Sequence, residues 1–254
     1  MIPGTRREAH DDVQPAPITL TGSEATSRSS APADGAQTPA GRLHLMQFWD
    51  TAIAPRDVED LMASWRNDPQ FTYHRYCWES ARAFIQDNFG LRELAVFDAC
   101  RVPAMQADVF RLCWLFEHAG IYVDADQGNR GRNQSFTDRT CRGHLFFRDP
   151  QRGIICNGLM SFFDRRDPLV GTLLERVCRN VEDRIDDGIW HVTGPGVISE
   201  LFAERGTHDG LFRNVHIHGV LELDNAMRFV RCGYKSGPSS WHNAVGSIYR
   251  TAPP

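Results

Sequence analysis

Residues 103–126 constrain the fold more than any other part of this sequence. Pro103 suits the first turn of a helix, where its missing N–H needs no partner, and Gly120 suits a helix end, because it tolerates a left-handed conformation. The apolar positions between them cover most of the helix circumference: Val109, Phe110, Leu112, Cys113, Leu115 and Phe116. Residues 121–123 then form a β-type run. A largely buried helix that leads straight into a short strand indicates an α/β protein.

Charged side chains accompany this helix and strand. Asp124 and Asp126 come directly after the strand, and because they are two residues apart, an extended chain would point them the same way. Two converging carboxylates repel each other unless a cation or a proton lies between them. Asp108 and Arg111 are three residues apart, so they share one side of the helix. Open α/β sheets bind ligands at the carboxyl ends of their strands, so we expect a site here.

The rest of the chain predicts further strands and helices. Before residue 103 we expect strands at 43–49, 71–76 and 94–97, a helix after Pro55, and a helix from Ser80 to Gly90 with Ala83, Phe84 and Phe89 facing inward. After Asp126 we expect a polar loop over 127–135, strands at 144–147, 154–163, 215–223 and 227–231, and helices at 168–181 and 197–204. The β-α-β-α-β-α-β order of the first half favours a mostly parallel sheet with helices on both faces.

Composition indicates the domain organisation. Residues 1–41 are rich in Pro, Ala, Ser, Thr and Gly and poor in bulky apolar residues. Such a segment cannot offset the entropy lost on ordering, so we predict a disordered N-terminal tail. The whole chain has 254 residues, of which 41% are hydrophobic. That is enough for a substantial core, and we predict that residues 42–254 form a single domain.

Charge and cysteine usage argue against several classes of protein. A net charge of -4 without a long basic run argues against a nucleic-acid binder. The seven cysteines are scattered and form no CxxC, so neither a zinc site nor a disulfide framework is signalled. No stretch is long and apolar enough to cross a membrane, and the N-terminus lacks the apolar core of a signal peptide. We expect a cytoplasmic protein, with peripheral contact at the inner face of the membrane left open.

An ordered set of short motifs carries a family resemblance. The motifs are Phe48-Trp49, Phe84-Ile85, Phe89-Gly90, Pro103-Ala104, Ala107-Asp108 with Arg111, residues 120–126, Asn157, the turn from Thr193 to Pro195, and Ser239 with Trp241 and His242. This set resembles the DXD-containing glycosyltransferases of family 32, the capsular-polysaccharide and mannosyltransferase type. More distantly it is similar to the sugar-transferring domains of the large clostridial toxins. A lone DxD is common by chance, whereas the ordered set from Asp108 to Asp126 is more specific.

The resemblance implies a fold, a reaction and its partners. It implies a GT-A fold, which is a Rossmann-like, mostly parallel central sheet with flanking helices and a small antiparallel addition. It implies a nucleotide-diphosphate sugar donor, a UDP-sugar in preference to a GDP-sugar, and a Mn²⁺ or Mg²⁺ ion. The transfer of a hexose would retain the anomeric configuration. The acceptor would be a hydroxyl of a glycan, a lipid-linked sugar or a protein.

Residue by residue, the resemblance assigns the donor contacts first. Trp49 matches the aromatic residue that stacks on the nucleotide base, and Tyr122 matches an aromatic residue beside the nucleotide. Asp108 and Arg111 match a pair that contacts the ribose and the sugar of the donor. Asn157 matches an amide near the transferred sugar. These residues would therefore form the donor site together.

The acidic motif and the C-terminal segment complete the implied site. Asp124 and Asp126 match the metal-binding acids, with Asp126 as the direct ligand. Ser239 and Trp241 match a C-terminal segment that closes over the metal and the diphosphate. His242 could approach the metal or phosphate, and a structural role fits it equally well. Oxygen ligands of this kind suit a hard divalent cation.

Simpler interpretations exist for each of these residues. The acid pair could be a solvated strand end, the Asp108–Arg111 pair only an intrahelical ion pair, Trp49 plain core, and Asn157 a partner of backbone groups. His216 and His218 share one strand face but have no evident third ligand, so we interpret them as an exposed face. Two departures from the family pattern also stand out. Ala119-Gly120 replaces a Gly-Gly, and residues 164–168 replace a Gly-His-Pro-like turn on the acceptor side.

Two other functions stay open. Phosphohydrolases of the haloacid-dehalogenase type also carry DxD after a hydrophobic strand and bind Mg²⁺. They use the first Asp as a nucleophile and need a later Lys, whereas here Gln127-Gly128 follows the acids and the only lysine is Lys235. A nucleotide-sugar-binding module without turnover is the other alternative. The combination of Asp108, Arg111, Asp124 and Asp126 favours the transferase over both.

Overall fold

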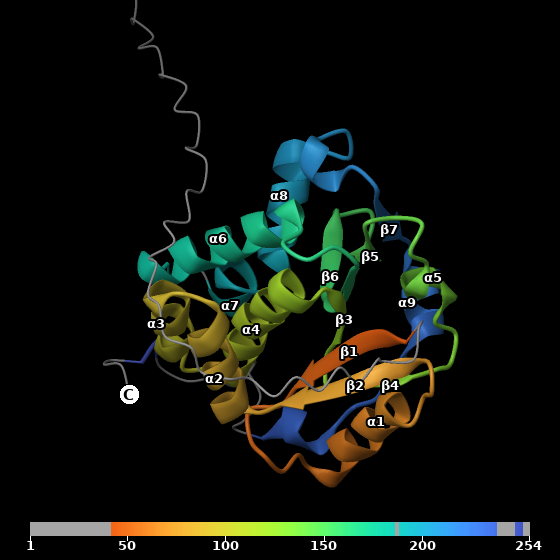
Figure 1. The fold of residues 1–254 in the computed structure, drawn as a ribbon, viewed down its shortest axis with the longest axis horizontal. Coiled ribbons are helices and arrows are strands. Elements are labelled where there is room, and N and C mark those ends of the chain that lie inside the picture. The colour runs from red at the N-terminus through yellow and green to blue at the C-terminus, as the bar shows by residue number, and fades with distance from the viewer. Residues whose placement is uncertain (1–41, 186–187, 238–246, 251–254) are drawn as a thin grey trace, which may run out of the picture. The chain divides into compact units, whose positions relative to one another are not determined.

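The computed structural model describes residues 42–185, 188–237 and 247–250 of the chain (Figure 1). The predicted tail over residues 1–41 lies outside this part, as do Ser239, Trp241 and His242. None of the helices among the described residues combines the length and the apolar character that a membrane span needs.

The central sheet has six strands in the order β2-β1-β3-β6-β5-β7. Their bounds are β1 Leu43–Phe48, β2 Phe71–Tyr76, β3 Gly120–Val123, β5 Gly143–Asp149, β6 Ile154–Phe162 and β7 Val215–His218. β1 pairs in parallel with β2 and β3, and β5 pairs in parallel with β7. β6 runs antiparallel between β3 and β5. A second, two-stranded antiparallel sheet joins β4 Gln127–Asn129 to β8 Met227–Phe229. The predicted α/β class, with a mostly parallel sheet and a small antiparallel addition, is confirmed.

Helices cover both faces of the central sheet. They are α1 Arg56–Arg66, α2 Trp78–Asn88, α3 Leu91–Ala99, α4 Pro103–His118, α5 Gln134–Thr137, α6 Pro168–Glu182, α7 Gly188–Val192, α8 Pro195–Arg205 and α9 Val220–Ala226, with 3₁₀ turns η1 Gly210–Phe212 and η2 Gly233–Ser236. In Figure 1, α4 and α6 lie on one side of the sheet and α1 lies on the other. Strand alternation produces this division: Met46 and Tyr122 pack into the apolar cluster of α4, whereas Leu45 and Ile121 pack with Trp65 of α1.

The α4–β3 unit forms as its sequence predicts. Pro103 is the first residue of α4, and most of the helix is buried. Ala119 follows with a φ of 57° and Gly120 with a φ of 127°, so the chain reverses without a loop. A Cβ on Gly120 would lie 2.6 Å from the backbone oxygen of His44. Glycine is therefore required both for the conformation and for the close approach to β1.

Three predicted elements were wrong in type. Residues 94–97, predicted as a strand, belong to α3, because Leu, Glu and Ala favour a helix and Gly90 leads into it as the N-cap. The predicted polar loop after Asp126 begins with β4, which pairs with a strand about a hundred residues away. The predicted strand 215–223 ends at His218, and α9 follows after Gly219.

One boundary, one buried face and one short helix also differ from the prediction. Helix α2 begins at Trp78, because the hydroxyl of Ser80 bonds the backbone of Cys77 from the third helical position and does not form the N-cap itself. Ala83, expected to face inward, is exposed, and Ala81 and Ile85 are the buried positions. The short helix α7 was not predicted, because four apolar or aromatic residues after a glycine give no clear helical period.

Candidate active site

The acid pair lies on a turn that follows β3. The backbone N–H of Asp124 donates to Gly158 of β6 at 2.9 Å, and the N–H of Gln127 closes the turn onto Asp124 at 3.1 Å. The sequence predicted that the two acids continue an extended strand, and this was wrong because they lie on a turn. Both acids nevertheless line the same cavity. A Cβ on Gly158 would lie 2.5 Å from Asp124 Oδ2, so the carboxylate occupies space that only glycine leaves free.

Helix α4 presents a buried ion pair to this turn. Asp108 Oδ1 lies 2.8 Å from a guanidinium nitrogen of Arg111, and both side chains are about 5% exposed. Asn157 Nδ2 donates to the same oxygen at 2.9 Å. Thr193 Oγ1 donates to Asp108 Oδ2 at 2.9 Å. Asp108 therefore connects α4 to β6 and to the segment before α8, which is more than an isolated intrahelical pair would do.

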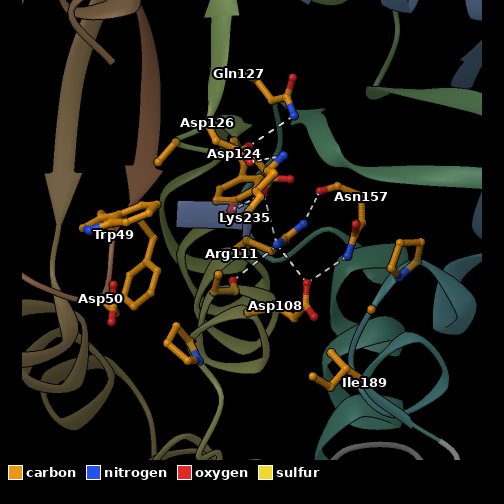
Figure 2. A pocket seen from close by; sticks show the side chains of 18 of the residues that line it. Trp49, Asp50, Asp108, Arg111, Asp124, Asp126, Gln127, Asn157, Ile189 and Lys235 are labelled. Carbon is orange, nitrogen blue, oxygen red and sulfur yellow. Dashed lines mark hydrogen bonds and ion pairs between the residues drawn. The ribbon is translucent and has the colours of Figure 1, made fainter. Parts of the chain in front are cut away.

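Arg111 connects the helix to the acid pair. Its guanidinium lies 3.3 Å from Asp124 Oδ1 and 4.3 Å from the centre of the Tyr122 ring. It also donates to the backbone oxygen of Asn157. Tyr122 in turn donates its hydroxyl to Asp124 Oδ1 at 2.7 Å. The planar guanidinium is thus fixed on several sides and keeps its orientation toward the cavity (Figure 2).

Asp126 is held by groups from β4 and from η2. Gln127 Nε2 donates to its Oδ1 at 3.1 Å. Tyr234 donates to its Oδ2 at 2.7 Å, and Lys235 Nζ lies 2.6 Å from the same oxygen. The segment is tied to α1, because the N–H of Gly233 donates to Asp57 at 2.7 Å. Tyr234 and Lys235 were not predicted as site residues, because no local signal in the sequence connects them with the distant acids.

A cavity of about 280 Å³ joins these groups. One part of its apolar lining comes from the end of β1 and the start of α4, namely Phe48, Trp49, Pro103, Ala104 and Ala107, and another part comes from Ile189, Trp190 and Pro195. Figure 2 shows Trp49 and Asp50 on one side of the pocket, Asn157 and Ile189 on the other, and Arg111 between them. The half-buried Trp49 meets the ring of Tyr234 edge-on at 5.0 Å. The cavity therefore has a flat apolar part beside a strongly polar part.

Burial perturbs the ionisation of this polar part. It raises the pKa of the Asp108 carboxyl to about 7, against the opposing effects of Arg111 and of the bond from Thr193. Burial also raises the pKa of the Tyr122 hydroxyl well above its ordinary value, and that of Tyr234, where Asp126 adds to the effect. Both phenols therefore stay protonated at neutral pH and remain donors to the acid pair.

The lining carries more negative than positive charge. Its carboxylates are Asp50, Asp108, Asp124 and Asp126, and its cations are Arg111, Arg148 and Lys235. An anionic ligand would enter a site with an excess of negative charge when all carboxyls are ionised. Such a ligand needs a further cation, or protonation of one acid, to bind well.

Comparisons with known proteins give a likeness of shape but no match of sequence family. No family model matches the chain, and no curated protein matches it. Among solved structures, the chain is similar to one described as "PaToxG Glycosyltransferase", with a TM-score of 0.48 and 13% sequence identity. The match covers 82% of this chain and 86% of that one. At this level the likeness says nothing about substrate, so function has to be inferred from the site itself.

The donor atoms around the acid pair fit a hard cation that shares its ligands with a substrate. Asp124 and Asp126 offer carboxylate oxygens at the cavity wall. Gln127 Oε1 is buried without a hydrogen-bond partner and lies beside them. No group of three or more His, Cys, Asp or Glu among the described residues could hold a metal by itself. Mg²⁺-type sites are commonly completed by substrate phosphates, so these residues suit such an ion.

The structure brings together all the predicted site residues that it describes. Trp49, Asp108, Arg111, Tyr122, Asp124, Asp126 and Asn157 all line the cavity. His216 and His218 lie on β7 and do not line it. The acceptor-side departure has a structural explanation: Asp167 caps α6 through the N–H of Leu169 at 2.8 Å and pairs with Arg142 at 2.6 Å. Residues 164–167 therefore form the turn that leads into α6 at Pro168, and none of them lines the cavity.

Proposed function

We propose that this chain is a metal-dependent glycosyltransferase that moves a hexose from a nucleotide-diphosphate sugar to an acceptor hydroxyl. The observation that carries the proposal is the position of Arg111. Its guanidinium contacts Asp108 and Asp124 at 2.8 and 3.3 Å and faces a cavity that also contains Asp126 and Trp49. A cationic group, an acid pair and an aromatic face around one cavity match the diphosphate, metal and base of such a donor.

The chemistry of the leaving group explains the charged residues. A nucleoside diphosphate leaves readily only when its developing charge is neutralised. A divalent cation held by Asp124 and Asp126 would supply that neutralisation and act as a Lewis acid. Arg111 donates in a fixed fork geometry and can stabilise charge on the oxygens of the diphosphate or of the sugar. When every carboxyl is ionised, the lining carries one more negative than positive charge, which favours binding of an additional cation.

The apolar part of the cavity suits the nucleotide base. Trp49 directly follows the carboxyl end of β1, is half-buried and lines the cavity. Stacking of a base on an aromatic face is worth roughly 1–3 kcal/mol. We retain a UDP-sugar as the preferred donor from the family resemblance, with a GDP-sugar as the second choice.

The hydrogen bonds of the acids support retention of configuration without a protein nucleophile. Both oxygens of Asp108 accept hydrogen bonds, and Asp124 Oδ1 is shared by Arg111 and Tyr122. These three carboxylate oxygens are therefore less available as nucleophiles toward a sugar. An acceptor hydroxyl would then attack from the same face as the departing diphosphate, and the rate would depend on positioning of the two substrates. The acceptor could be the hydroxyl of a glycan, of a lipid-linked sugar or of a protein.

The proposal is tested by nucleotide release from a panel of UDP- and GDP-sugars with Mn²⁺ or Mg²⁺, with and without candidate acceptors. We expect release with one donor class, loss of release on chelation, and loss in Asp126→Ala. The exposed Asp87 provides a matched control, since Asp87→Asn removes an acid that does not line the cavity. Phosphate release from simple monoesters would favour a phosphohydrolase. Metal-dependent nucleotide binding without turnover with any acceptor would favour a binding module.

A further inference from the structure

Lys235 is chemically unique in this chain. Of the 28 Lys and Arg residues it is the one lysine, and it lines the cavity. Its Nζ lies 2.6 Å from Asp126 Oδ2. An ammonium group is a compact point charge, unlike the planar guanidinium of arginine. A protein-borne cation therefore lies on the carboxylate that the proposed function assigns to a divalent ion.

Asp126 Oδ2 already has two partners. Tyr234 donates to it at 2.7 Å in addition to Lys235, and a carboxylate oxygen has about two lone-pair sites. The other oxygen accepts from Gln127 at 3.1 Å. A divalent ion would bind at about 2.0–2.6 Å from an oxygen. An ion on Oδ2 would therefore displace the ammonium, and an ion on the open lone pair of Oδ1 would lie close enough to repel it.

The ammonium can leave without moving its backbone. Lys235 has a four-carbon stem and its side chain is 36% exposed. The backbone of η2 is fixed separately, by the Gly233–Asp57 hydrogen bond and by the ring contact of Tyr234 with Trp49. Rotation about the lysine side chain is thus enough to break the ion pair.

Asp126 cannot simply lose its counter-ion. The residue is 8% exposed, and a buried carboxylate left without a cation is strongly destabilised. The departure of Lys235 is therefore favourable only when another cation arrives. An anionic diphosphate in the cavity would give the released ammonium a new partner and would favour the same exchange.

We propose that Lys235 is an exchangeable cation of the site. It neutralises Asp126 in the free protein, gives way to a divalent ion, and then pairs with the diphosphate of the donor. The last step rests on the proposed function, whereas the exchange at Asp126 does not. Metal and diphosphate consequently bind with positive coupling, because each favours the same position of the lysine.

The exchange is tested by Mn²⁺ binding to the full chain without nucleotide, followed by electron paramagnetic resonance. We expect Lys235→Met to bind Mn²⁺ about tenfold or more tightly than the wild type, because the competing cation is gone. Lys235→Arg keeps the charge and should bind like the wild type. Equal affinity in the wild type and Lys235→Met overturns the exchange, provided circular dichroism shows that the variant is folded.

A second measurement uses the wild-type chain and needs no variant. Reductive ¹³C-methylation labels only Lys235 and the N-terminal amine, so the lysine gives one side-chain signal in the NMR spectrum. Saturating Mg²⁺ should move this signal toward that of a free methylated lysine, and UDP should then move it again. A signal that stays in place with Mg²⁺ overturns the exchange. A shift with Mg²⁺ but none with UDP or GDP overturns the diphosphate step and counts against the proposed donor.

Discussion

Replacing Asp108 by asparagine is expected to stabilise the protein at pH 8 while it damages the site. Asp108 is 5% exposed, and it accepts from Asn157 and Thr193 at 2.9 Å each. Asparagine has the same shape and keeps one acceptor. The hydroxyl of Thr193 can rotate to accept from the new amide group. The substitution therefore removes a buried charge with little change in packing, and Asp124 at 3.3 Å remains as the counter-ion of the buried Arg111.

The magnitude follows from the perturbed ionisation of Asp108. Burial raises its pKa from 3.8 to about 7 in the folded protein. The folded state thus binds this proton more tightly than the unfolded state does. The resulting stability is fully present below pH 3.8 and is lost as the pH rises through 7. The difference corresponds to about 4 kcal/mol, of which about 2.5 kcal/mol falls between pH 5 and pH 8. Asparagine does not titrate, so Asp108→Asn escapes this loss.

The assay is urea unfolding of wild type, Asp108→Asn and the exposed-site control Asp87→Asn between pH 5 and pH 8.5. We expect the free energy of unfolding of Asp108→Asn to rise relative to wild type by about 2.5 kcal/mol across this range. Asp87→Asn should stay parallel to wild type. Two results would contradict this expectation: plots of the free energy of unfolding against pH that are parallel for Asp108→Asn and wild type, or a variant that becomes less stable than wild type at high pH. Either result would mean that ionisation of Asp108 does not destabilise the folded protein.

Three further substitutions test other parts of the site. Arg111→Lys keeps the charge but loses the planar group that meets the two acids through one nitrogen and the backbone oxygen of Asn157 through another, and we expect kcat to fall by about 10²–10³-fold with a smaller change in KM, measured by nucleotide release. Trp49→Ala should weaken nucleotide binding by roughly 1–3 kcal/mol in calorimetry, whereas Trp49→Phe should retain most of the affinity. Gly120→Ala meets both a φ of 127° and a backbone oxygen 2.6 Å from the new Cβ; it should lower the free energy of unfolding by more than about 1 kcal/mol, and an unchanged melting temperature would contradict this.

Local signals explain which parts of the fold could be predicted. Pro103 and Gly120 define α4 and the start of β3 within one short segment, and the apolar period between them predicts burial. The strand predicted at residues 94–97 was wrong because a short apolar run fits a strand and a buried helix equally well. Strand β4 was not predicted because its partner β8 lies far along the chain and its three residues carry no strand pattern of their own.

The candidate site shows the same division. Asp108 and Arg111 lie in α4, and Asp124 and Asp126 lie in the turn directly after β3, so the sequence alone places the four residues in one short segment. Lys235 reaches Asp126 from 109 positions later in the chain, a contact that only the tertiary structure reveals. No spacing rule connects two such distant residues, and a single lysine near the C-terminus carries no motif.

The close approach of Gly158 to Asp124 has a consequence for how this site can change in evolution. The carboxylate fills the space that a side chain at position 158 would need, since a Cβ there would lie 2.5 Å from Asp124 Oδ2. The two positions are therefore epistatic: Gly158→Ala should displace the acid in the wild-type background but cause little further harm beside Asp124→Ala. A double-mutant cycle on the free energy of unfolding would give a coupling within about 0.5–3 kcal/mol, and strict additivity would show that the two positions vary independently.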